Sequence, residues 1–469
     1  MSTRAWDVRL REPHWTPVVP GASVRRRVRV MALVGVPLVL WYLSWLLSPE
    51  RVGHPVLYGL LVAAEALNVL QAVGLWWTAA NERVRPAKPP TRPASVDVLI
   101  PRYDEPVEVV ELTVAAAVGL RGTDVRVWLL DDGDSDEMRD LAERNGARYL
   151  RRPVHDHAKA GNINHALEHI DAEYVAVVDC DHVVDPRFVE ACLGHFEDDE
   201  RLAFVQTPQY YANGDRPGIA GAAWTQQTLF FGVIARGKDG LGAMFCCGTN
   251  VVFRRTALDA TGGFPTHSIT EDFELTITLH EQGWHTAYLP EILAAGLGPD
   301  DMGSYVTQQL RWARGCLSAL PRIVRARLGA RLKAQYLLSG LYWLTGWTVL
   351  VYLSFPLITI LTGAQPLDNL TAPEFLLHFA PYFVLALTTV AVAGGGSFTF
   401  AGLAVSGACF WLHIVASVLT VLRRRCSFKV TPKVGVAGPQ PRVVWPTLAT
   451  VAVLVGVSVY GLVRERDAA

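Results

Sequence analysis

The chain has 469 residues, of which 51% are hydrophobic and only 19% are charged. Soluble proteins usually carry about a quarter of charged residues, so this deficit indicates segments buried in a membrane. Lysine and arginine number 43 against 44 aspartates and glutamates, which gives a formal charge of -1. A general nucleic-acid-binding protein needs a basic surface, so nucleic acid is excluded as a partner. The seven cysteines contain no CxxC pair, which argues against a zinc site and a disulfide framework.

Two apolar runs open the chain, at residues 30–47 and 56–78, each near the length of about 20 residues that crosses a bilayer. A polar stretch precedes the first run and no small-residue cleavage site follows it, so we expect an anchor rather than a signal peptide. Basic residues before the first run predict a cytoplasmic N-terminus: Arg25, Arg26, Arg27 and Arg29. We therefore expect residues 1–92 to form two transmembrane helices, which return the chain to the cytoplasm, and a linker.

Residues 93–333 form a polar block in which short apolar runs alternate with helical patterns. The predicted strands are 96–100, 125–130 and 174–178, and the predicted helices are 107–118 and 158–169. This alternation predicts βαβ units and a parallel sheet. Ligands of such sheets bind at the carboxyl ends of the strands. Acidic residues stand where these strands stop: Asp104, Glu105, Asp131, Asp132, Asp179 and Asp181.

Residues 334–469 contain four further apolar runs, at 336–362, 375–393, 400–422 and 443–463. If all four crossed the membrane, the basic residues that follow the third run would lie outside the cell, against the positive-inside rule. We therefore expect 400–422 to lie along the cytoplasmic interface and 443–463 to cross. This gives a multi-pass protein of the cell membrane with five spans, with six as the alternative.

Two acidic motifs point to cation and nucleotide chemistry. Asp179 and Asp181 alternate directly after a strand, and their hard oxygen ligands suit Mg²⁺ or Mn²⁺. Asp131-Asp132-Gly133 ends an earlier strand and is suited to holding a nucleoside. The alternatives are a solvated turn for the first motif and an ordinary Asp-Gly turn for the second.

Three later motifs complete the candidate chemistry. Lys159 stands in a helix start where it can face phosphate, although a solvated first turn has the same pattern. Thr270-Glu271-Asp272 offers a general base, or alternatively the capped, exposed start of a helix. Gln308-Gln309-Leu310-Arg311-Trp312 combines a cation for diphosphate with a flat ring for a sugar, or forms an amphipathic interfacial helix.

In this order, Asp-Asp-Gly, Lys-Ala-Gly-Asn, Asp-x-Asp, Thr-Glu-Asp and Gln-x-x-Arg-Trp resemble the processive family 2 glycosyltransferases, and above all their cellulose synthase branch. The matches extend to 100–106, 231–238 and 245–249. Phe428-Lys429-Val430-Thr431-Pro432-Lys433 looks like the gating loop of cellulose synthases. Arg102 departs from the pattern, because a small polar residue is expected there, and this bears on the donor contacts.

The resemblance implies a GT-A-like fold with a Rossmann-like mixed sheet, inserted between transmembrane α-helices. It implies an inverting, metal-dependent, UDP-forming hexosyltransferase that polymerises a β-glucan from UDP-glucose and moves the product across the membrane. The implied partners are a UDP-sugar donor, a growing polysaccharide acceptor and membrane lipid, and an extracytoplasmic partner protein is left open. UDP-N-acetylglucosamine or GDP-mannose as donor, non-processive transfer, and an inactive transport or structural subunit remain alternatives.

The resemblance also implies residue roles. The implied catalytic residues are Asp272, Glu271 and Asp181, and the implied metal ligands are Asp179 and Asp181. A larger set would bind the nucleotide sugar: Asp104, Glu105, Asp131, Asp132, Lys159, Asp179, Gln308 and Arg311. The residues that would bind the acceptor are Cys247, Gly248 and Trp312. The residues of the implied gating loop are Phe428, Val430, Thr431 and Lys433.

Overall fold

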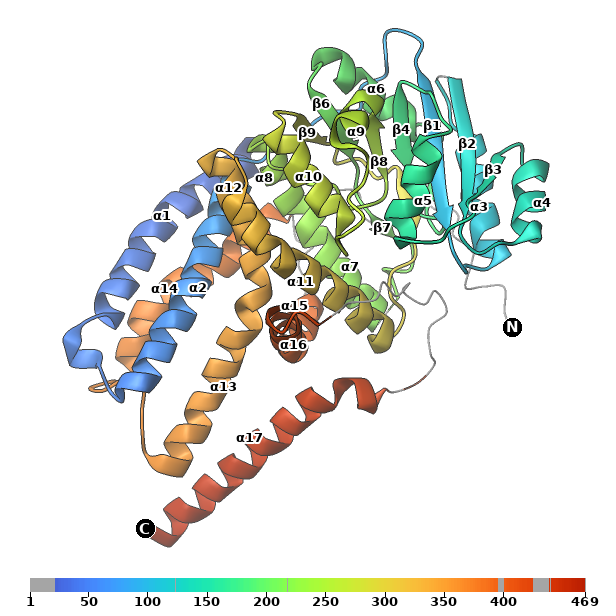
Figure 1. The fold of residues 1–469 in the computed structure, drawn as a ribbon. Helices are drawn as coiled ribbons and strands as arrows, with labels where there is room; N and C mark the ends of the chain where they lie inside the picture. The colour runs from blue at the N-terminus through green and yellow to red at the C-terminus, as the bar shows by residue number, and fades with distance from the viewer. Residues whose placement is uncertain are drawn as a thin grey trace.

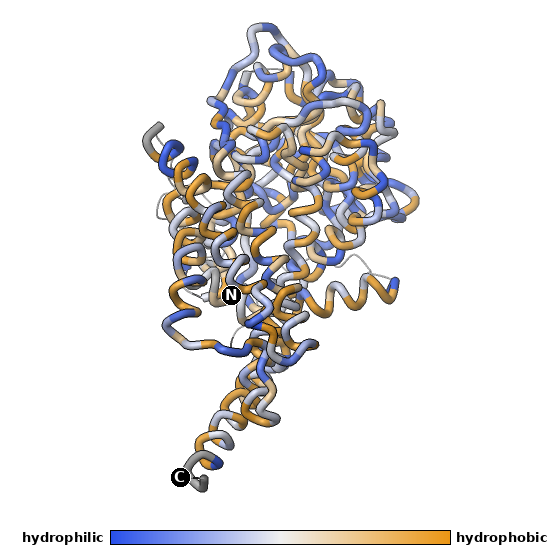
Figure 2. The backbone as a smooth tube through the Cα atoms, turned by 90° about the vertical axis from the view of Figure 1, so that its left-hand side faces the viewer, coloured by the Kyte–Doolittle hydropathy of each residue, from blue (hydrophilic) through white to orange (hydrophobic). Residues whose placement is uncertain are grey.

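A computed structural model describes residues 22–122, 124–216, 218–394, 400–424, 438 and 440–468. An α/β unit lies beside a set of long helices (Figure 1). These helices are α1 (Ala22–Leu46), α2 (Pro55–Ala80), α13 (Thr345–Thr362), α14 (Ala372–Ala393) and α17 (Pro441–Ala468). Figure 2 shows hydrophobic residues dominating these helices and hydrophilic ones gathering over the α/β unit.

The α/β unit is built on a seven-stranded mixed sheet in the order β3-β2-β1-β4-β8-β6-β9. Its first four strands are parallel, and β8 runs antiparallel to both of its neighbours. The strands are β3 (Arg148–Arg151), β2 (Asp124–Asp131), β1 (Ser95–Arg102), β4 (Tyr174–Val177), β8 (Val251–Arg254), β6 (Leu202–Gln206) and β9 (His285–Tyr288). A smaller sheet has the order β5-β10-β7. It consists of β5 (Val183–Val184), β10 (Ala294–Gly296) and β7 (Tyr210–Tyr211).

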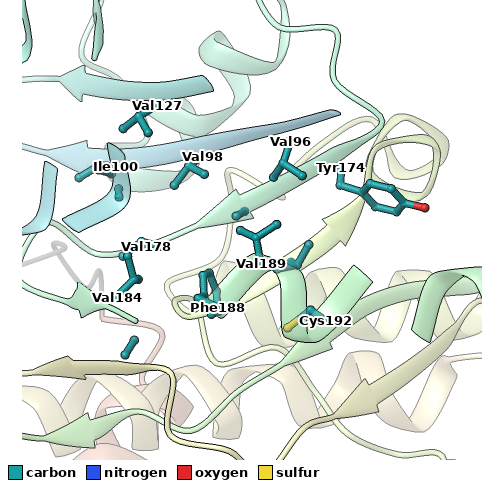
Figure 3. Packing of buried hydrophobic residues seen from close by; sticks show 14 of the residues in the cluster. Val96, Val98, Ile100, Val127, Tyr174, Val178, Val184, Phe188, Val189 and Cys192 are labelled. Atoms are coloured by element: carbon teal, nitrogen blue, oxygen red, sulfur yellow. The ribbon is translucent and has the colours of Figure 1, made fainter. Parts of the chain in front are cut away.

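Helices cover both faces of the large sheet, so its central strands are apolar on both sides. Val96, Val98 and Ile100 of β1 pack into one core cluster with Phe188, and Leu99 points into the other. Figure 3 shows the first of these clusters. The sheet-packing helices are α3 (Val107–Val118), α4 (Asp136–Arg144), α5 (Ala158–Leu167), α6 (Phe188–Asp198), α9 (Arg255–Thr261) and α10 (Glu271–Glu281).

A third group of helices lies between the sheet and the long helices (Figure 1). It comprises α7 (Ile219–Leu229), the π-helix Phe230–Ile234, α8 (Ala235–Gly240), α11 (Met302–Arg325), α12 (Ala330–Leu341), α15 (Phe400–Ala408) and α16 (Phe410–Val421). Short 3₁₀ turns occupy Pro49–Arg51 and Tyr342–Leu344.

Among the described residues, five helical stretches are long and apolar enough to cross a membrane: Val24–Leu46, Pro55–Ala80, Ala330–Thr362, Ala372–Ala393 and Pro441–Arg464. This count agrees with the favoured prediction of five spans. The run at 400–422 is divided between α15 and α16, of 9 and 12 residues, and neither reaches a bilayer's thickness of about 20 residues. The expected domain limits and orientation stay predictions.

Candidate functional site

The predicted acids gather where the order of the sheet reverses. The chain passes from β1 outward to β2 and β3, then returns to place β4 on the other side of β1. Such a switch point leaves a crevice at the carboxyl ends of the strands, where ligands bind. Leu99 pairs with Val177, and Arg102 pairs with Asp131. The register therefore places Asp179 level with the end of β1.

Asp131, at the end of β2, is fully buried and accepts hydrogen bonds on both oxygens. Oδ1 accepts from Arg102 Nη1 and the Gly133 amide, both at 2.9 Å. Oδ2 accepts from the Ser135 amide at 2.8 Å and the Tyr149 hydroxyl at 2.7 Å. Burial acts to raise the pKa of Asp131, but these hydrogen bonds outweigh it and hold that pKa below its ordinary value. Asp131 therefore stabilises an Asp-Gly turn that itself lies at the candidate nucleotide-binding edge of the sheet, so the two interpretations of this motif are compatible.

Asp132 forms a buried, bidentate ion pair with Arg152. Arg152 Nε lies 2.5 Å from Oδ1, and Nη2 lies 2.6 Å from Oδ2. Arg152 Nη1 also donates to the Asp156 carbonyl at 2.6 Å, which ties the end of β2 to the turn before α5. Of the other predicted nucleotide residues at this edge, Asp104 is exposed, and Glu105 is buried with the Tyr103 amide 2.9 Å from Oε2.

The start of α5 carries Lys159 into the crevice. His157 and Ala158 adopt left-handed backbone angles, φ 66° and 46°, immediately before and at the first residue of the helix. The Lys159 ammonium pairs with Asp179 and donates to the Gly248 carbonyl at 2.7 Å. Burial alone would lower the pKa of Lys159, but Asp179 and Glu271 raise it above its ordinary value, so the amine is charged. The interpretation as a solvated first turn is wrong.

Asp179 and Asp181 lie with a third candidate ligand, His182. Their ligand atoms all lie within 4.8 Å of one another. His182 Nδ1 is 3.2 Å from Asp181 Oδ1, and the buried Nε2 has no hydrogen-bond partner among the described residues. Two carboxylates and an imidazole with an unpartnered nitrogen fit a divalent cation. Sequence reasoning missed His182, although it directly follows Asp181.

Asp272 lies in the first turn of α10, beside a buried Glu271. Burial, reinforced by the Glu271 carboxylate, raises the pKa of Asp272 to about 7. A general base works best with a pKa near the working pH. The alternative of an exposed, capped helix start is wrong, because Thr270 makes no side-chain cap hydrogen bond and its hydroxyl is buried.

Gly248 lies between Lys159 and Asp272. Its carbonyl accepts from Lys159, while a Cβ at this position would lie 2.9 Å from Asp272 Oδ2. Its φ of +82° belongs to the left-handed region that glycine tolerates. The neighbouring Cys247 is held by Gln206, whose Oε1 accepts a hydrogen bond from the Cys247 amide at 2.8 Å. Gln206 was also missed; its only signal is a polar residue closing an apolar strand.

The predicted Gln-x-x-Arg-Trp motif lies on α11, whose Gly315 abuts Thr270, the residue before α10. A Cβ on Gly315 would meet the Thr270 side chain at 2.1 Å, so glycine permits this close approach. Burial raises the pKa values of both Glu271 and Asp272, and Arg311 lies near enough to oppose part of that increase. Gln308 Nε2 is 3.5 Å from the Tyr211 hydroxyl. Trp312 is half-buried against the cluster between α11 and α16, so this motif also serves the packing of a helix at the predicted interface.

The predicted gating-loop residues Phe428, Val430, Thr431 and Lys433 lie outside the described residues. Their role stays a prediction.

Known proteins resemble this chain in both sequence and fold. Residues 174–395 match the family model described as "Glycosyl transferase family group 2". The chain is 33% identical over 382 residues to the cellulose synthase 1 catalytic subunit [UDP-forming] of Komagataeibacter xylinus, covering 78% of this chain and 50% of that protein. It is 32% identical over 460 residues to the cellulose synthase catalytic subunit [UDP-forming] of Pseudomonas fluorescens, covering 93% of this chain and 62% of that protein. The chain therefore spans about half the length of the first relative and less than two thirds of the second.

The fold has a solved counterpart in a mannosyltransferase from Pyrobaculum calidifontis, in complex with GDP-Man and Mn²⁺. The TM-score is 0.59 at 17% identity, over 79% of this chain and 100% of that one. This likeness concerns the fold alone, and it agrees with the expected GT-A-like mixed sheet. Together the family model and the curated relatives show that the chain belongs to the family 2 glycosyltransferases and is similar to cellulose synthase catalytic subunits.

Proposed function

We propose that the protein is a processive, inverting glycosyltransferase that polymerises a β-glucan from UDP-glucose and passes it across the membrane. The proposal follows the relatives, which are named as UDP-forming cellulose synthase catalytic subunits. The observation that carries it is the position of Gly248 between Lys159 and Asp272. A charged lysine that could face a diphosphate and a carboxylate with a pKa of about 7 thus lie on either side of one residue.

In the proposed reaction, a hydroxyl of the acceptor sugar attacks the anomeric carbon of the donor. The hydroxyl proton passes to an oxygen of Asp272. The bond between the anomeric carbon and the diphosphate breaks, and its electron pair leaves with UDP. A single displacement inverts the configuration, so an α-linked donor gives a β-linkage. Lys159 and Arg311 stabilise the departing charge, because each is a cation close to the base.

Asp179, Asp181 and His182 would hold a divalent cation, which neutralises the diphosphate as it departs. The mannosyltransferase with the related fold contains Mn²⁺. Carboxylates suit both Mg²⁺ and Mn²⁺, whereas imidazole is a ligand of transition metals. We therefore expect either ion to support transfer, and Mn²⁺ to bind more tightly.

The five candidate spans and the basic residues in the first turns of α1 support a membrane enzyme whose α/β unit faces the cytoplasm. There it would meet UDP-sugars. Processivity rests on the resemblance of residues 428–433 to a gating loop. Lys433→Ala tests it: a gating role predicts shorter product, and an unchanged length distribution would count against it.

Radiolabelled sugar incorporation by the purified full chain in nanodiscs tests the proposal. UDP-glucose, UDP-N-acetylglucosamine and GDP-mannose are compared with Mg²⁺ and with Mn²⁺, and products are digested with linkage-specific β-glucanases. Long, β-glucanase-sensitive product from UDP-glucose is expected. Short product, or product from another donor, would keep the chemistry but overturn processivity or the donor. Binding of nucleotide without transfer from any donor would favour an inactive subunit.

A further inference from the structure

The end of α5 opposite to Lys159 brings together three side chains that the proposed reaction does not use. His165 lies in the last turn of the helix, and Glu168 and His169 follow in the turn that ends it. One ligand atom of each residue lies within 4.8 Å of the other two. His165 Nδ1 is 3.9 Å from Glu168 Oε2, and the centroids of the two imidazole rings are 4.5 Å apart. Separations of three and four residues place side chains on one face of a helix, which explains the grouping.

The turn that carries these side chains is held from inside the domain. Leu167 and Ile170 are buried in the core cluster beneath α5. Arg255 of α9 donates hydrogen bonds to the carbonyls of both residues, at 2.8 and 2.7 Å. The backbone of the turn is therefore fixed, and the three side chains stay close together when they rotate. Ligands on a fixed backbone lose little conformational freedom when they bind.

A hydrogen bond within the group sets the protonation of His169. Its Nδ1 lies 2.8 Å from the carbonyl oxygen of His165. A carbonyl can only accept, so Nδ1 carries a proton, and in the neutral ring Nε2 carries the lone pair. Histidines that bind metal ions commonly donate their second nitrogen to a carbonyl in this way. His169 Nε2 is thus available as a ligand atom.

The ligand types select the class of cation. Imidazole suits Zn²⁺ and related transition metal ions, whereas Mg²⁺ and Ca²⁺ take oxygen ligands. Ligand atoms at about 2.0–2.1 Å from a tetrahedral Zn²⁺ are about 3.4 Å from one another, so small side-chain rotations would close the group around an ion. The carboxyl-terminal end of α5 also carries the negative end of the helix dipole, which favours a cation. The missing CxxC pair does not bear on this group, because none of its ligands is a cysteine.

We propose that His165, Glu168 and His169 form a second metal site, which binds Zn²⁺ or a transition metal ion of similar chemistry. The site is separate from the cluster around Asp179, since Lys159, the partner of Asp179, lies at the other end of the helix. The bound ion fastens the last turn of α5 to the turn that follows it. This inference does not depend on the proposed function, because the site takes no part in the transfer reaction.

Equilibrium dialysis against Zn²⁺ tests the proposal, with the full chain in nanodiscs and without a polyhistidine tag. The wild type is expected to bind one Zn²⁺ per chain that depends on these residues. His165→Ala and His169→Ala should each weaken its binding about a hundredfold, since even the loss of an outer partner of a ligand costs about 10–100-fold. Zn²⁺ binding that is the same in the wild type and in both variants would overturn the proposal. An unchanged affinity in Glu168→Gln would overturn the assignment of Glu168 as the third ligand.

His267→Gln is the matched control. His267 is exposed and also faces a carboxylate, with Nε2 2.8 Å from Glu274 Oε1, but no third ligand joins this pair among the described residues. Its Zn²⁺ affinity should equal that of the wild type. His182→Ala tests the separation of the two sites, because it removes a ligand from the other cluster and should leave the ion at His165 in place. Loss of that same ion in His182→Ala would overturn the separation.

Protection of the wild-type chain from diethyl pyrocarbonate gives a second reading that does not depend on the folding of a variant. This reagent modifies imidazole nitrogens whose lone pair is free, and mass spectrometry locates the modified residues. At a free Zn²⁺ concentration about ten times the dissociation constant, about a tenth of the sites are empty, so modification of His165 and His169 should slow about tenfold. His267 should react at the same rate with and without Zn²⁺. Equal rates at His165 and His169 with and without Zn²⁺ would overturn the proposal.

Discussion

Both sides of the crevice contain a pair of adjacent acidic residues, but the two pairs have different surroundings. On the β2 side, Asp131 and Asp132 are buried but each is bound by an arginine. On the α10 side, Glu271 and Asp272 lie next to each other, and burial raises the pKa of both. The first pair is held in place by ion pairs with arginine. The second contains a group that can accept a proton near neutral pH, so the environment, rather than the residue type, separates structure from chemistry.

The largest expected effect comes from removing the base on the α10 side. Asp272→Asn keeps the shape of the side chain but removes its ability to take a proton. General-base catalysis contributes about 10²–10⁴-fold, so we expect turnover to fall about a thousandfold. The affinity for UDP should change less than about threefold, because Asp272 does not carry the nucleotide. Initial rates of sugar transfer and UDP binding measure the two quantities.

Asp140→Asn is the control for this change, since Asp140 is exposed on α4. Its rate should match that of the wild type. Turnover above a tenth of the wild-type rate in Asp272→Asn would remove Asp272 as the base.

On the β2 side, the largest effect should fall on stability. Arg152→Gln leaves the buried Asp132 carboxylate without its bidentate partner. Breaking a buried pair in this way costs about 3 kcal/mol, because one charge stays buried and uncompensated. We expect a lower unfolding temperature and a lower yield of folded protein. Arg144→Gln removes an exposed pair with Glu111 and should cost less than about 1 kcal/mol. Equal losses in the two variants would contradict the distinction.

The fold on the β2 side was predictable because its signals are local. The runs 96–100 and 125–130 lie within β1 and β2, and the helix predicted at 107–118 has the limits of α3. Apolar runs bounded by turn residues specify such elements without knowledge of their partners. The antiparallel entry of β8 between β4 and β6 was not predicted, because strand pairing across the chain has no local signal.

The site was predictable to the same extent. Strand ends located Asp131, Asp179 and Asp181, since acids directly after an apolar run lie at the carboxyl edge of a parallel sheet. Nothing local tells that Arg152 binds Asp132, or that Gly315 allows α11 to approach Thr270. Those contacts depend on how distant segments pack. The local sequence therefore does not reveal whether an acid is held in an ion pair or has a raised pKa.

Gly248 lies between Lys159 and Asp272 of the α10 side, and Gly248→Ala should disturb this arrangement. The new Cβ would lie 2.9 Å from Asp272 Oδ2 on a backbone with φ +82°. A left-handed residue other than glycine costs about 1–2 kcal/mol, and the contact displaces the base as well. We expect turnover to fall about tenfold to a hundredfold while UDP binding changes little. Rates and UDP dissociation constants measured together separate these effects.

Gly262→Ala provides the control, because Gly262 has φ +74° and a Cβ there meets nothing within 4 Å. It reproduces the backbone strain without the contact to the base. A rate loss in Gly262→Ala as large as that in Gly248→Ala would mean that strain alone explains the effect.

The smallest expected effect is a pH dependence that belongs to the α10 side alone. Asp272 must be unprotonated to accept the hydroxyl proton, and its pKa is about 7. The transfer rate should therefore fall about tenfold per pH unit below 7 and level off above it. Because Glu271 is the second cause of the raised pKa after burial, Glu271→Gln should move the midpoint to lower pH. Asp140→Asn should leave the midpoint in place. A rate that stays constant from pH 5.5 to 8, or a midpoint that moves upward in Glu271→Gln, would contradict the assignment of Asp272 as the group that titrates.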